Sequence, residues 1–187
     1  MPLALLAQVN SASAEDRDWA MTMYVAQISA EEGWEDVMVN PAFADYVGDY
    51  LVVAALSTDY AHYRGGALQL EAEGQVAYNF GGDQHHWEFN AVPIAARWLR
   101  FPWSQTVATS AAAGIGLSYA THVPEIEVEL EGESEKLLVY WFAEITAGPV
   151  DAPWSVLLRL HHRSVAYGLL GEEGGMNGVG LGLRYRF

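Results

Sequence analysis

The chain contains 187 residues, enough for one domain with a sizeable hydrophobic core. It has no cysteine, which excludes disulfides, thiolate nucleophiles and cysteine-ligated zinc. Its formal net charge of −15 argues against nucleic acid as a partner, because a surface that binds phosphates needs basic patches.

The first fourteen residues, MPLALLAQVNSASA, combine a short apolar run with an Ala-Ser-Ala motif and precede two acidic residues. Small residues at this spacing are typical of a signal peptidase site, although the usual basic segment is missing. We interpret residues 1–14 as the remnant of a secretory signal, the alternative being that they are no signal. Residues 15–187 then form a single domain. The chain has no run of 18 or more apolar residues, so we expect no transmembrane helix.

Alternation of apolar and polar residues, the pattern of a half-buried strand, recurs along the chain after residue 18. It is clearest from Ala67 to Phe80. The pattern predicts eight strands, at 19–30, 50–63, 67–80, 85–101, 107–120, 134–146, 154–167 and 177–187. Helical periodicity is weak, and the acidic clusters between the strands predict loops, at Glu31 to Asp36, Glu125 to Glu135 and Glu172-Glu173.

Most of these predicted strands are about twice as long as the roughly 5–6 residues that are usual in soluble proteins. Their length and even number match a small bacterial outer-membrane barrel, in which each strand has one apolar and one polar face. Closing the sheet also removes unpaired edges, which a bilayer cannot satisfy. We therefore predict an all-β fold, an eight-stranded antiparallel transmembrane β-barrel in the outer membrane of a Gram-negative bacterium. The alternative is a soluble lipocalin-like barrel with an apolar interior.

The connectors and the chain end fit the same fold. We expect long outer loops at 31–49, 81–85, 121–133 and 168–176, and short periplasmic turns near 64–66, 102–106 and 147–153. The final aromatic, Phe187, follows apolar residues at alternate positions, which resembles the C-terminal signature of bacterial outer-membrane proteins. Lumen-facing acids at Glu71, Glu73 and Glu88 should be neutralised by Arg159, Arg163, Arg184 and Arg186, which have inward parity.

The seventh predicted strand carries a candidate catalytic pair. Residues two apart on a strand point to the same side, so His162 and Ser164 share a face that is otherwise apolar. Polar side chains that face lipid cost free energy, which favours a functional role for the pair. A serine hydroxyl needs a neighbouring base before it can act as a nucleophile, and histidine is the commonest such base.

The segment Leu160-His161-His162-Arg163-Ser164, followed by a Gly-rich loop, Asn177 and a last strand, resembles the lipid A 3-O-deacylases of the PagL type. Those are eight-stranded outer-membrane barrels that hydrolyse an ester-linked acyl chain of lipid A. The close resemblance covers the last part of the chain, and the rest agrees in architecture alone. It implies that Ser164 is the nucleophile and His162 the base, with Asn177 and Gly168 at the oxyanion hole.

This sequence departs from the family in the residue that orients the histidine. The family has a Glu shortly after the Asn, where this chain has no carboxylate. The candidates for orienting His162 are Glu144, Glu172, Glu173 and Asn177 itself. Glu144 has lumen-facing parity, and Glu173 is favoured because a loop residue can reach over the barrel rim.

The function expected from the resemblance is that of a serine esterase acting on lipid A of lipopolysaccharide, surrounded by outer-membrane lipid and without a cofactor. The alternative is a non-catalytic structural or adhesive barrel. The pair His85-His86 suggests a metal ligand set, but we interpret it as a pair at a loop edge and expect no metal site.

Overall fold

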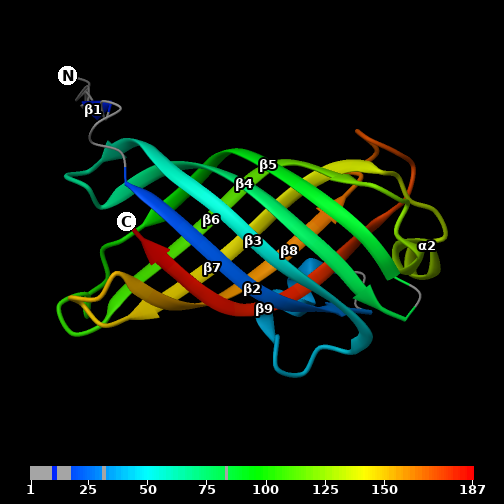
Figure 1. The fold of residues 1–187 in the computed structure, drawn as a ribbon, viewed down its shortest axis with the longest axis horizontal. Helices are drawn as coiled ribbons and strands as arrows, with labels where there is room; N and C mark the ends of the chain where they lie inside the picture. Colours follow the sequence, from blue (N-terminus) through cyan, green and yellow to red (C-terminus); the bar gives the residue numbers. More distant parts are fainter. Residues whose placement is uncertain (1–9, 12–17, 31–32, 83) are drawn as a thin grey trace, which may run out of the picture.

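The computed structural model describes residues 10–11, 18–30, 33–82 and 84–187, and most of them belong to one closed sheet (Figure 1). Each long strand pairs antiparallel with its neighbours in the chain, and β2 closes the ring against β9. The eight strands are β2 (Trp19–Ser29), β3 (Tyr46–Tyr63), β4 (Leu68–Gly81), β5 (Gln84–Trp98), β6 (Ala108–Ala120), β7 (Leu137–Gly148), β8 (Trp154–Ser164) and β9 (Gly175–Arg186). The predicted eight-stranded antiparallel barrel is confirmed.

The segment before β2 is described in one place. The two-residue strand β1 (Asn10–Ser11) pairs with β3. The rest of residues 1–14, which we interpreted as a signal remnant, lies outside the described residues. Among the residues that the structure does describe, no helix combines the length and the apolar character needed to cross a membrane.

The barrel has an apolar exterior. On β2 the exposed side chains of Met21, Met23 and Val25 alternate with buried Thr22 and Tyr24. A water-soluble barrel has the opposite arrangement, with charge outside and apolar residues within. The lipocalin-like alternative is therefore wrong, and the exterior is of the kind that faces hydrocarbon.

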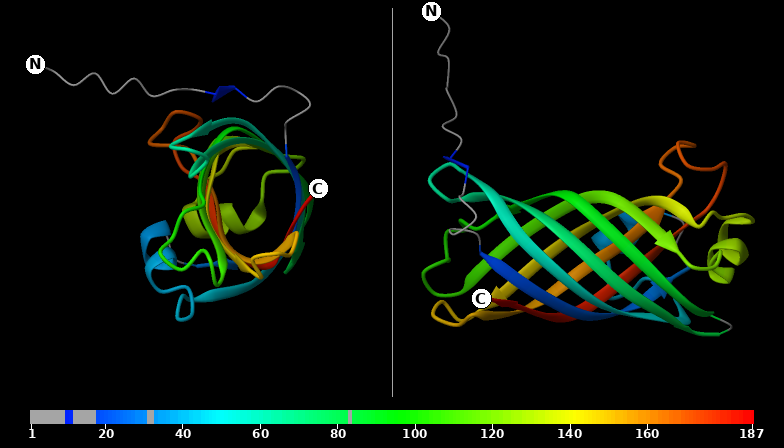
Figure 2. Two further views of the ribbon diagram at one scale, coloured as in Figure 1. Left: turned by 90° about the vertical axis from the view of Figure 1, so that its left-hand side faces the viewer. Right: turned by 45° about the horizontal axis from the view of Figure 1, so that its top comes forward.

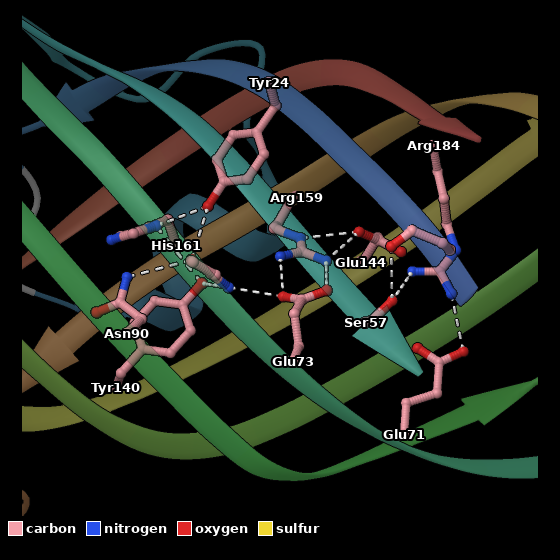
Figure 3. Close-up of polar contacts among 12 residues, drawn as sticks. Tyr24, Ser57, Glu71, Glu73, Asn90, Tyr140, Glu144, Arg159, His161 and Arg184 are labelled. Carbon is pink, nitrogen blue, oxygen red and sulfur yellow. Dashed lines mark hydrogen bonds and ion pairs between the residues drawn. The ribbon is translucent and has the colours of Figure 1, made fainter. Parts of the chain in front are cut away.

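The interior is packed with ionic side chains (Figure 3). Arg159 contacts Glu73 and Glu144 at N···O distances of 2.7 and 2.6 Å, and its guanidinium lies 4.0 Å from the centroid of the Phe142 ring. Further ion pairs join Arg97 to Glu71 and Glu144, Arg163 to Glu88, and Arg184 to Glu71. The predicted neutralisation of the lumen acids is confirmed for three of the four arginines. Arg186 is exposed and forms no ion pair within the described part of the chain.

Two short helices replace predicted loops at one end of the barrel. The helix α1 (Trp34–Val39) lies outside the wall, whereas α2 (Glu125–Glu131) lies across the barrel mouth (Figure 2). Both contain acidic clusters for which the sequence predicts loops. Two acidic residues in the first turn of each helix interact favourably with the helix dipole. With six and seven residues, the helices are too short for a periodicity that needs a window of roughly 11–18 residues.

The seventh strand ends earlier than predicted. It stops at Ser164 rather than at residue 167, because Ala166 and Tyr167 have φ angles of 49° and 59°. Non-glycine residues rarely adopt this left-handed conformation, and it turns the chain out of the sheet. Ser164 is therefore the last residue of β8, at the end of the barrel that carries α1 and α2 (Figure 1).

Candidate active site

The candidate pair lies on the outer wall. His161 and Arg163 point into the lumen, where they contact Glu88 at 2.9 and 3.4 Å. Because side chains alternate along a strand, His162 and Ser164 face outward. Ser164 is the last residue of the strand, and His162 is the outward-facing residue before it, nearer the middle of the barrel.

His162 is oriented by Asn177 of the neighbouring strand. The two residues stand directly opposite each other in the β8–β9 register. His162 Nδ1 lies 2.7 Å from Asn177 Oδ1, and because an amide oxygen can only accept, the imidazole donates through Nδ1–H. This tautomer leaves the lone pair on Nε2. Asn177, one of the candidates for orienting His162, makes this contact through its carbonyl oxygen, and its place at the oxyanion hole stays a prediction.

One tryptophan packs against the histidine, and a second tryptophan packs against the first. Trp141 stands opposite His162 in the β7–β8 register, and their ring centroids are 4.9 Å apart. Trp34 of α1 meets Trp141 edge to face at 5.1 Å. His162, which contacts Trp141 and Asn177, is only 8% exposed. Neither tryptophan is among the site residues predicted from the sequence. The outward parity of Trp141 on β7 was an available signal, whereas Trp34 depends on how the first outer loop folds back.

Ser164 and His162 line one cavity of about 250 Å³. Asn177, Glu172 and Glu173 also line it, and α2 contributes through Leu130 and Glu131. Ser164 Oγ accepts a hydrogen bond from the Ala166 N–H at 3.4 Å. Among the residues that the structure describes, no hydrogen bond joins Ser164 to His162. Catalytic hydrogen bonds are often long or absent in apo structures and tighten when substrate binds.

The other predicted site residues are distributed as follows. Glu173 shares the cavity, but among the described residues no hydrogen bond links it to His162. Glu144 is bound to Arg97 and Arg159 in the lumen and so lies on the far side of the wall. Gly168 has a φ of +85° in the loop after β8 and does not belong to the cavity lining.

Comparison with solved structures places this arrangement in a known fold. The barrel resembles the outer membrane enzyme PagL with a TM-score of 0.57 and 13% sequence identity, over 89% of this chain and 98% of that one. It resembles Neisserial surface protein A with a TM-score of 0.51 and 11% identity, over 91% and 96% of the two chains. The chain has the fold of an outer-membrane β-barrel. No protein-family model and no curated protein matches the sequence.

On this barrel the site offers the parts of a nucleophile and base pair. An amide oxygen holds Nδ1 of the imidazole, so that Nε2 carries the lone pair of the neutral ring, and a serine hydroxyl occupies the next outward position. Neighbouring outward positions on a strand are about 7 Å apart, so long and short side chains can meet across the gap. Within the described residues no cluster of three or more His, Cys, Asp or Glu side chains could hold a metal ion.

Proposed function

We propose that this protein is an outer-membrane serine esterase that removes an ester-linked acyl chain from lipid A. The observation that carries the proposal is the hydrogen bond from His162 Nδ1–H to Asn177, which leaves Nε2 as a base beside Ser164. Polar side chains on a lipid-facing wall cost free energy. A histidine held in one tautomer beside a serine at such a position therefore favours a catalytic role over a structural one. The fold similarity to the outer membrane enzyme PagL also supports this proposed function.

The depth of the pair supports lipid A as the substrate. In barrels of this type short turns face the periplasm and the longer loops face outward. His162 and Ser164 lie at the end of β8 that carries α1, α2 and the loop 165–174. That end would therefore stand in the outer leaflet of a Gram-negative outer membrane, where lipid A resides. An ester close to the headgroups would meet the cavity at the rim of the barrel.

The reaction follows from the two side chains. His162 Nε2 takes the proton of Ser164 Oγ as that oxygen attacks the ester carbonyl carbon. The Ala166 N–H, which donates to Ser164 Oγ, stabilises the negative charge that develops on this oxygen as its proton leaves. When the tetrahedral intermediate collapses, Nε2 returns the proton to the departing sugar hydroxyl. Water, deprotonated by the same nitrogen, then releases the fatty acid from the serine.

A second candidate is a non-catalytic surface barrel. It is favoured by the Ser164 hydroxyl, which is hydrogen bonded to Ala166 rather than to His162, and by the similarity to Neisserial surface protein A. In that case His162 and Asn177 would stabilise the rim of the barrel without reacting. The two candidates differ in one measurable property, hydrolysis of the lipid.

The test is incubation of the purified barrel with lipopolysaccharide, followed by mass spectrometry of lipid A. We expect loss of one acyl chain with the unmodified protein. Ser164→Ala and His162→Ala should each lower the rate by at least about 10³-fold. The matched control is His85→Ala, because His85 is exposed at the outer end of β5, away from the site. Unchanged lipid A with the unmodified protein, across pH values, would exclude the esterase and favour the surface barrel.

A further inference from the structure

A second cavity runs along the outer wall beneath α1. Its volume is about 310 Å³. We call it the α1 groove, and its main lining residues are Val37, Met38, Ala143, Leu158, Leu160 and Val179. Figure 2 shows α1 outside the ring of strands, so the groove is bounded by the barrel wall on one side and by the helix on the other.

The helix that covers this groove is suited to hydrocarbon. Val37 is fully buried against the wall, while Met38 and Val39 on the same short helix are 48% and 81% exposed. Phe43, in the connector after the helix, is 82% exposed. The first turn of the helix carries exposed Glu35 and Asp36, so α1 combines apolar and charged side chains, as expected of a short helix at the boundary between lipid and water.

The α1 groove is continuous with the candidate active site. Trp141, His162 and Asn177 form one row across β7, β8 and β9. The next outward row toward the middle of the barrel consists of Ala143, Leu160 and Val179, and these three residues line the groove. The groove therefore begins directly beneath the site.

The direction of the groove matches the geometry of a membrane lipid. From the row of Leu160 it continues to Leu158 and Ile145, away from the rim and toward the centre of the wall. In an outer leaflet, an acyl chain leaves its ester in that same direction. The small side chain of Ala143 lies between larger neighbours, which leaves room for a chain against the wall.

We propose that the α1 groove binds one acyl chain of a membrane lipid, with α1 as the wall that holds it. This inference rests on the proposed function, because the acyl chain bound in the groove would be the one whose ester reaches Ser164. The groove thereby determines which chain length is accepted. Trp34, packed on Trp141, fixes the start of α1 at the height of His162.

The first experiment tests occupancy without catalysis. Ser164→Ala protein is reconstituted in phosphatidylcholine vesicles that contain a phosphatidylcholine with a diazirine in one acyl chain, illuminated, digested and analysed by mass spectrometry. We expect Met38 and Leu160 to be labelled about tenfold more than outward Phe89 and Ile94 on β5, since a bound chain is held longer than a passing one. Equal labelling of both groups would overturn the proposal.

A substitution that fills the groove provides the matched comparison. Ala143→Phe should abolish the excess labelling, whereas Ala91→Phe, at an exposed outward position of β5 outside the α1 groove, should preserve it. Heat-modifiable migration in detergent gels verifies that both variants form the barrel. Persistence of the excess labelling in Ala143→Phe would place the lipid elsewhere and overturn the proposal.

The second experiment tests chain selection. If the barrel hydrolyses esters, Ala143→Phe should lower kcat/KM for long-chain esters by about tenfold or more and leave a butyrate ester unaffected. A protein that labels in the groove but cleaves no ester would contradict the proposed function alone. A protein that cleaves esters but labels uniformly would contradict the groove alone.

Discussion

At the residue scale, the unusual feature of the site is an amide where a triad has a carboxylate. Asn177 holds the tautomer and the ring plane of His162, and Trp141 holds the ring from the side. In the proposed reaction an imidazolium forms during proton transfer, and an amide cannot neutralise it as a carboxylate does. We therefore propose that the main contribution of Asn177 is to orient the ring.

That role predicts different outcomes for two substitutions of Asn177. Asn177→Leu, which removes the acceptor, should lower kcat by about 100-fold with little change in KM. Asn177→Asp keeps an acceptor at the same position and should retain activity within about tenfold of the unmodified protein. The measurement is lipid A hydrolysis with folded barrels of both variants. Equal kcat values for the Leu variant and the unmodified protein would show that Asn177 does not orient the base.

Sequence reasoning recovers one part of this site and misses another. The outward facing of His162 and Ser164 follows from the two-residue period of a strand, and Asn177 has the same parity on the next one. The atom that Asn177 offers to the imidazole, and the contact of Trp34 with Trp141, depend on side-chain rotamers and on a loop that folds back over the wall. Neither leaves a periodic signal in the sequence.

At the scale of elements, the strands were predictable and the two helices were not. Alternation over more than ten residues identifies each strand. The predicted first and last residues of the strands differ by a few positions from the observed ones, because alternation alone does not show where pairing with the neighbouring strand ends. The helices α1 and α2 are held by tertiary contacts instead. In α2, Glu127 is fully buried, contacts Arg163 at 2.9 Å and accepts a hydrogen bond from the Ser134 hydroxyl.

The docking of α2 should depend on pH through Glu127. Burial raises the pKa of the Glu127 carboxyl from 4.5 to about 7, although Arg163 and the Ser134 hydroxyl oppose the shift. The docked helix therefore keeps a proton that an undocked helix releases above pH 4.5. Docking is strongest below that value and weakens as pH rises toward and through 7.

Hydrogen exchange checks this pH dependence. The protection factors of the α2 amides, corrected for intrinsic exchange, should fall on the order of 100-fold between pH 4 and pH 8. Glu127→Gln removes the titrating group and should make the protection of α2 independent of pH. Constant protection in the unmodified protein would mean that Glu127 is ionised throughout and stably paired with Arg163.

At the scale of the whole molecule, the barrel is held by charges that face one another across a closed lumen. Eight strands leave an interior that side chains can fill, and here arginines bridge acids from distant strands (Figure 3). Arg159 from β8 joins Glu73 of β4 to Glu144 of β7. The contacts of Arg159 with Glu73, Arg97 with Glu144 and Arg184 with Glu71 tie together strands that are not neighbours in the sheet.

Removal of the central arginine should therefore destabilise the entire barrel. Arg159→Leu leaves Glu73 buried with no other ion pair in the described residues, and breaking a buried pair in this way costs about 3–5 kcal/mol. Arg186→Leu is the matched control, because Arg186 is exposed and unpaired within the same residues. Urea unfolding in lipid vesicles, followed by heat-modifiable migration, measures both. Equal midpoints would mean that water reaches the lumen and screens these charges, so that the strand hydrogen bonds alone hold the wall on which His162 and Ser164 stand.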